Sequence, residues 1–122
     1  MIRDMEKLLY ALSKTKFRGS FHLNKKMKEY VKNKGLIKIE EDAKEIITKR
    51  LGGSNPLNDG RQTPMKQVHP VFIAQHATGC CCRNCLEKIH HIKKGKELTN
   101  NEINYIVKVI MLWIKKEVGI CE

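Results

Sequence analysis

The 122-residue sequence has no long hydrophobic run and few aromatic residues. No stretch approaches the roughly 20 apolar residues that a membrane-spanning helix needs. The first residues, MIRDMEKLL, lack the pattern of a secretory signal peptide. We therefore predict a cytoplasmic protein that does not enter a membrane. Aromatic residues make up only 6% of the chain against 41% hydrophobic residues in total, so its core must be mainly aliphatic.

Acidic residues are also scarce. The chain has 13 Asp and Glu residues against 24 Lys and Arg residues, which gives a formal net charge of +11. Such a surplus creates a positive field that attracts polyanions, of which nucleic acid is the commonest and acidic proteins are another class. A lysine-rich, solvated surface without a specific partner is the alternative explanation.

No segment alternates apolar and polar residues for long enough to require a strand, although QVHPVFI is ambiguous. The length fits one domain. We predict an all-α fold in which residues 1–122 form a single compact domain of five to six short helices with one long central loop.

The expected helices follow from apolar residues at helical spacing and from end signals. Asn24 is a candidate N-cap and Gly35 a stop for the second helix, Pro70 suits a first helical turn, and Thr99 and Glu102 match a capping box. The connection 13–23 is expected to be anchored by Phe17, Phe21 and Leu23. We expect helices over residues 3–13, 24–35, up to Leu51, from Pro70 to about Gly79, within 81–91, and 99–114.

The expected central loop covers residues 52–69 and contains the turn-forming run NDGRQT at 58–63. A structureless loop of this length is unusual in a compact domain, so it is either functional or flexible. Asp59 and Arg61 can pair or face a ligand. Asn and Asp also stabilise turns by bonding to their own backbone, which is the simpler explanation.

Four of the five cysteines lie within six residues, at Cys80, Cys81, Cys82 and Cys85, and the fifth is Cys121. In a cytosolic protein this clustering indicates metal binding or thiol chemistry more than disulfides. Together with neighbouring histidines these residues form a Cys/His cluster at 69–91.

The spacing Cys82-x2-Cys85-x4-His90 matches three of the four ligands of a zinc knuckle, but Gly95 stands where the fourth would be. The fourth ligand must therefore come from upstream. If 81–91 were one continuous helix, His90 would lie about 140° around the axis from Cys85 and would join only if the helix ended first. We predict zinc as the cofactor. The candidate ligands are His76, Cys81, Cys82, Cys85 and His90, with His69 as a further upstream histidine. The preferred set is His76, two of the three cysteines and one further histidine.

Two other interpretations of the cysteines remain open. Cys82, Leu86 and Ile89 can form an ordinary core stripe, because cysteine packs like a small apolar residue. A cysteine at a helix N-terminus, next to Arg83 and near a histidine base, can instead be a reactive thiol. The catalytic candidates for an enzyme are Cys85, His76 and Asp59, with polar help from Gln62.

The positive charge is concentrated in residues 14–34, where eight basic residues face Glu29 alone. Lys and Arg neutralise phosphates, and interleaved aromatic rings can stack on exposed bases. The same lysines can equally form a solvated helix face. The candidate contacts to a polyanion are Lys14, Lys16, Arg18, Lys25, Lys26, Lys28 and Lys32.

Three stretches together, SKTKFRGSFHL (13–23), NDGRQTPMKQVHPVFIAQHATGCCCRNCLEKIHHI (58–92) and LTNNEINYIVKVIMLWI (98–114), resemble an uncharacterised bacterial family, domain of unknown function 4186, nearly end to end. The family has no assigned activity, so the resemblance implies a set of shared residues and no function. This chain departs from the family pattern by one extra residue before His69, and by Ile89 for Trp, His91 for Gly and Lys93 for Pro. The shared residues are Phe17, Arg18, Phe21, His22, Asn58, Asp59, Gly60, Gln62, Thr63, Pro64, His69, Pro70, Gln75, His76, Ala77, Thr78, Cys81, Cys82, Arg83, Cys85 and His90.

These observations predict a small basic α-helical protein that binds one zinc ion and engages nucleic acid or another polyanion through its N-terminal basic segment. One alternative is an enzyme that combines the Cys/His site with the NDGRQT loop. A second alternative is an interaction module, such as an inhibitor or adaptor, for an acidic protein partner.

Overall fold

The computed structural model describes residues 2–54 and 63–119, and within these ranges it contains helices and no strand. The all-α prediction is therefore confirmed for the described part of the chain. No helix there combines the length and the apolar character needed to cross a bilayer. The helices are α1 (Ile2–Ser13), α2 (Lys25–Lys34), α3 (Leu36–Leu51), α4 (Pro70–Thr78), α5 (Arg83–His90) and α6 (Asn100–Val118), with a short 3₁₀ helix η1 (Arg18–Ser20).

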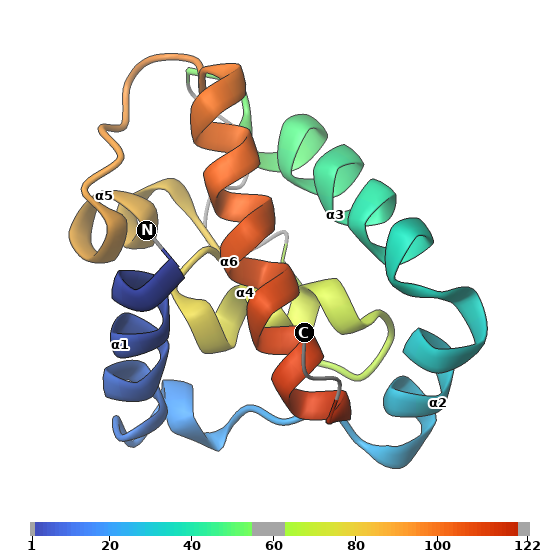
Figure 1. Cartoon of the computed structure of the whole chain (residues 1–122). Helices are drawn as coiled ribbons and strands as arrows, with labels where there is room; N and C mark the ends of the chain where they lie inside the picture. The colour runs from blue at the N-terminus through green and yellow to red at the C-terminus, as the bar shows by residue number, and fades with distance from the viewer. Residues whose placement is uncertain (1, 55–62, 120–122) are drawn as a thin grey trace.

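The longest helix, α6, runs through the middle of the molecule (Figure 1). It packs mainly against α3 and α4, while α4 also contacts α1, α2 and η1. In the view of Figure 1, α1 and α5 lie to the left of α6, and α2 and α3 lie to its right. Helix α4 thus occupies the centre, and the turn that leaves it toward α5 starts from the interior.

The helix ends form where local signals predicted them. The Asn24 side chain accepts a hydrogen bond from the Met27 backbone N–H at 2.9 Å and caps α2. Thr99 and Glu102 form the predicted capping box at the start of α6. Pro70 occupies the first turn of α4. These caps satisfy backbone groups that a helix cannot pair internally, which fixes where each helix begins.

The core is aliphatic, as the composition requires. Its fully buried side chains come mainly from α3, α4 and α6, and they include Ile39, Ile47, Leu51, Ile73, Ile106, Ile110 and Ile114. Leu23 is buried and Phe21 packs partly against the core. Phe17 is 52% exposed, so its predicted role as a core anchor is wrong; its ring meets Phe21 edge-on at the surface instead.

Arg83, at the start of α5, is the largest fully buried side chain and is only 2% exposed. Its Nη1 donates hydrogen bonds to the carbonyls of Leu51 (3.0 Å) and Gly53 (2.6 Å), and its Nη2 to those of Lys93 (3.0 Å) and Lys96 (2.9 Å). A cation at the C-terminal end of α3 is favoured by the helix dipole. Arg83 therefore connects the start of α5 to the end of α3 and to the segment 93–96.

The expected loop 52–69 is described only at its two ends, 52–54 and 63–69. Thr63 is 5% exposed, and its hydroxyl donates to the Cys81 carbonyl at 2.9 Å. The Gln67 side chain donates to the His22 carbonyl and accepts from the Asn24 N–H. The predictions for Asp59, Arg61 and Gln62 concern residues outside the described part of the chain.

Candidate metal centre

The turn between α4 and α5 sets the positions of the clustered cysteines. Gly79 ends α4 with φ 76°, a left-handed conformation that glycine adopts at little cost. The chain then leaves the helix, and Cys82 is the N-cap of α5 rather than part of a helix that starts at residue 81. Cys80 Sγ consequently lies beside His90, whereas Cys81 and Cys82 both direct their sulfurs toward Cys85.

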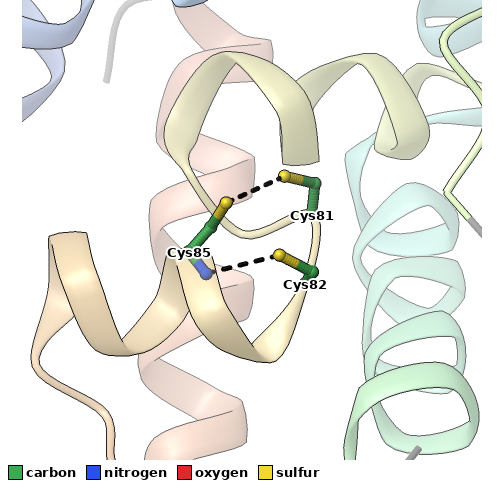
Figure 2. Close-up of side chains that lie close together, drawn as sticks. All are labelled: Cys81, Cys82 and Cys85. Atoms are coloured by element: carbon green, nitrogen blue, oxygen red, sulfur yellow. Dashed lines mark hydrogen bonds between the residues drawn. The ribbon is translucent and has the colours of Figure 1, made fainter. Parts of the chain in front are cut away.

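Cys81, Cys82 and Cys85 bring their sulfur atoms together, and all three Sγ atoms lie within 4.8 Å of one another. Figure 2 shows Cys81 and Cys82 on the connecting segment and Cys85 on the first turn of α5. The Sγ atoms of Cys81 and Cys85 are 3.6 Å apart, and the Cys85 backbone N–H donates to Cys82 Sγ at 3.3 Å. Thiolates about 2.3 Å from one tetrahedral ion are separated by roughly 3.8 Å. The three sulfurs can therefore hold a metal ion.

Arg18, from η1, reaches the same sulfurs from a distant part of the sequence. Its Nη2 lies 3.2 Å from Cys85 Sγ and its Nη1 lies 3.8 Å from Cys81 Sγ. Nη1 also donates to the His76 carbonyl at 2.6 Å. The guanidinium thus faces the cysteines, and Arg18 is half-buried rather than projecting like its neighbouring lysines.

The contacts of Cys81 and Cys85 shift the pKa values of the two thiols in opposite directions. A hydrogen bond from the Cys85 thiol lowers the pKa of Cys81 to about 7, helped by Arg18 and opposed by burial. The same hydrogen bond, together with burial, raises the pKa of Cys85. The thiolate form of Cys81 is therefore favoured over that of Cys85, and the charge of Arg18 stabilises it.

His76 lies beside the site but does not belong to the group of three sulfurs. Its Nε2 is 2.9 Å from the Thr63 carbonyl, and since a carbonyl only accepts, Nε2 carries the proton. The ring stacks on Phe21 with centroids 5.2 Å apart. The remaining nitrogen, Nδ1, is buried without a hydrogen-bond partner. His76 therefore keeps a free lone pair in the interior.

The other candidate histidines have partners elsewhere. His90 Nε2 donates to the Thr78 carbonyl at 2.7 Å, its Nδ1 pairs with the Tyr105 hydroxyl at 3.0 Å, and the sulfur nearest to it is that of Cys80 at 3.5 Å. Burial lowers the pKa of His90 and raises the pKa of Cys80 to about 12, so both are neutral. His69, at the start of α4, accepts from the Val71 N–H and pairs with Asp42. These two histidines thus lie outside the three-sulfur group.

The structure bears on the two other interpretations of the cysteines, the core stripe and the reactive thiol. Cys82 is 7% exposed next to the buried Leu86, as the core-stripe interpretation expects, but its sulfur also caps α5. The reactive-thiol interpretation expected positive charge from Arg83. The Arg83 guanidinium donates to four backbone carbonyls, and the guanidinium that reaches the sulfurs of Cys81 and Cys85 is that of Arg18. The expected charge effect of Arg83 stays a prediction. Only the shared FR segment of the family resemblance gave a sequence signal for Arg18.

The predicted polyanion-binding residues other than Arg18 lie mostly at the surface. Lys14, Lys16, Lys25, Lys26 and Lys32 are exposed, and Lys28 is half-buried. The prediction that they bind a polyanion stays a prediction.

Comparison with known proteins identifies a family that matches this chain. A family model described as "Domain of unknown function (DUF4186)" matches residues 6–115. No solved structure matches the chain. The match covers all three cysteines of the site, Arg18 and His76, and its description carries no activity.

Proposed function

The chain belongs to the DUF4186 family, whose description names no function, and from the site itself we propose that it binds one zinc ion through the thiolates of Cys81, Cys82 and Cys85. The observation that carries this proposal is the convergence of the three Sγ atoms within 4.8 Å. Sulfur ligands favour zinc, copper(I) and iron–sulfur clusters. Three cysteines fall short of the four that iron–sulfur clusters take, which favours a single ion.

Charge supports a divalent ion. Three thiolates exceed the charge of a divalent cation by one negative charge, and the Arg18 guanidinium beside Cys81 and Cys85 supplies one positive charge. With a monovalent ion the half-buried site would keep a net negative charge, which is costly where water is scarce. Zinc is the divalent ion that three cysteines suit best.

His76 is the candidate fourth ligand in this proposal. A histidine that ligates zinc through one nitrogen typically donates its other N–H to a carbonyl or carboxylate, and His76 makes this bond to Thr63. Its partnerless Nδ1 offers the lone pair. Because the ring lies outside the three-sulfur group, ligation requires the ring to approach the ion, and water occupies the fourth position otherwise.

Zinc analysis of untagged protein under reducing conditions tests this proposal. We expect about one zinc per chain, and loss of that zinc in Cys82→Ser. Serine is a good N-cap, so this variant keeps the hydrogen bond that starts α5 and removes only the sulfur. The matched control is Cys80→Ala, because Cys80 lies with His90 and not with the three sulfurs.

Cobalt substitution is an independent test of sulfur ligation, because cobalt bound to thiolates shows a charge-transfer absorption band. The proposal fails if the reduced wild-type protein takes up neither ion, or if Cys82→Ser holds zinc as tightly as the wild type does.

A second function, binding of nucleic acid through the N-terminal basic segment, is proposed from the exposure of six of its seven lysines. Affinity for a DNA or RNA duplex should fall steeply with salt. Lys25→Gln/Lys26→Gln should reduce the slope of log affinity against log salt by up to about 2, since each phosphate contact contributes about 0.9. Lys88→Gln/Lys108→Gln, which changes two exposed lysines outside the segment, should not. Absence of binding at low salt, or equal losses in both variants, would leave an acidic protein as the candidate partner.

A further inference from the structure

We propose that Cys81 and Cys85, when no metal is bound, form a reversible dithiol–disulfide pair that exchanges with small anionic disulfides of the glutathione type. This proposal uses two of the three sulfurs of the zinc site but does not require that zinc binds. Cys82 and Cys80 are not members of the pair.

The geometry of the two sulfurs favours their joining. The Sγ atoms of Cys81 and Cys85 are 3.6 Å apart and need to close by roughly 1.5 Å to reach the length of a disulfide bond. Cys81 lies on the connecting segment and Cys85 on the first turn of α5, facing each other (Figure 2). The side chain of Cys85 is also partly exposed, which gives a disulfide access to the pair.

Arg18 supplies the electrostatics that thiol–disulfide exchange requires. During exchange, negative charge passes from the attacking sulfur to the leaving one, and reactive cysteines are found next to cationic groups. The guanidinium contacts both Sγ atoms, so it stabilises a thiolate on either of them. The net charge of +11 further attracts a disulfide that carries carboxylates.

The reaction balances with the disulfide as the oxidant. The thiolate of one cysteine of the pair attacks one sulfur of the disulfide, forms a mixed disulfide and releases one thiolate. The thiol of the other cysteine then gives up its proton to that thiolate and attacks the protein sulfur of the mixed disulfide, which releases the second thiolate, and this takes a proton from solvent. The protein gives up two electrons and one proton, solvent supplies the second proton, and the small disulfide is reduced to two thiols.

The neighbouring cysteines are held in other roles. Cys82 Sγ accepts the Cys85 backbone N–H at 3.3 Å, so a disulfide to Cys82 would remove the cap of α5. Cys80 is fully buried and lies 3.5 Å from His90 Nε2. The structure therefore favours one pairing out of several among four closely spaced cysteines.

The test equilibrates the metal-free full-length chain in buffers of reduced and oxidised glutathione, followed by acid quenching, alkylation and peptide mass spectrometry. We expect a disulfide between Cys81 and Cys85, with Cys80 and Cys82 alkylated. Cys85→Ser should instead accumulate a mixed disulfide with glutathione on Cys81, because the second step is removed. A disulfide that involves Cys80 or Cys82, or no disulfide even in the most oxidising buffer, would overturn the proposal.

Arg18→Gln tests the electrostatic step, since it keeps hydrogen-bond donors and removes the charge. The rate of oxidation should fall about tenfold or more, as expected for loss of a charge-assisted contact. Lys88→Gln on the exposed side of α5 is the matched control and should react at the wild-type rate. An Arg18→Gln rate equal to that of the wild type would contradict the role of Arg18.

Cys82→Ser separates this proposal from zinc binding. This variant should lose zinc and still form the Cys81–Cys85 disulfide. If it keeps exchange while the wild type binds no zinc, only the zinc proposal fails; if the wild type binds zinc and its metal-free form shows no exchange, only the redox proposal fails.

Discussion

Replacing Arg83 by Met should lower the free energy of unfolding by about 3–5 kcal/mol, because several backbone carbonyls lose a charged donor and each unpaired buried group costs about 1–3 kcal/mol. Met fills much of the volume of Arg but cannot donate, so the carbonyls of Leu51, Gly53, Lys93 and Lys96 lose their shared donor. Urea denaturation followed by circular dichroism measures the change.

Two variants show whether the geometry of Arg83 matters. Arg83→Lys should recover only part of the loss, because an ammonium cannot present the planar fork that serves four carbonyls at once. Lys88→Met changes an exposed cation on the same helix and should stay within about 0.5 kcal/mol of the wild type. A loss below about 1 kcal/mol for Arg83→Met would contradict the role of Arg83 as the tie between these segments.

Gly79→Ala should lower the free energy of unfolding by about 2–4 kcal/mol, because it adds strain in a left-handed backbone and overpacks the neighbouring side chains. Gly79 has φ 76°, and a Cβ there would lie 2.5 Å from Cδ1 of Ile89 on α5. The added methyl group pushes directly on the helix that carries Cys85. Denaturation gives the energy, and zinc content reports whether the sulfurs have moved apart.

Gly119→Ala isolates the backbone part of this cost. Gly119 ends α6 with φ 79°, nearly the same as Gly79, but a Cβ there meets nothing within 4 Å. Gly119→Ala should therefore lower the free energy of unfolding by only about 1 kcal/mol. Gly79→Ala/Ile89→Val, which removes the closest clashing atom, should recover part of the difference. If the two alanine variants lost the same free energy of unfolding, the Ile89 side chain would have moved aside at no energetic cost, which would contradict the overpacking argument.

The sequence predicted the helices because their signals are local. Asn24, Pro70 and Thr99 with Glu102 each act within one helical turn, and the structure has all of them at helix starts. The sequence also indicated Cys81, Cys82 and Cys85 as candidate ligands, since they are close in sequence. It favoured two of them with two histidines, whereas the structure brings all three sulfurs together without a histidine.

The contacts of Arg18 and Arg83 were not predictable in the same way. Arg18 is 67 residues from Cys85, and its place in a lysine-rich segment indicated the surface. Arg83, adjacent to a cysteine, indicated a role in thiol activation, yet its partners are backbone carbonyls at 51–53 and 93–96. Backbone carbonyls exist at every position, so no residue type marks them as partners. Contacts of this kind depend on how distant segments pack.

The N-cap of α5 has an evolutionary consequence. A thiol is a weak hydrogen-bond acceptor, and Ser, Asp and Asn are the residues that cap helices best. Selection for a stable α5 alone would favour one of these at position 82, yet the chain has Cys82 there, with its sulfur on the Cys85 N–H. Relatives that no longer depend on the chemistry of the third sulfur should drift toward Ser or Asp at this position. The residue found there would then separate relatives with a working three-sulfur site from those that retain only the fold.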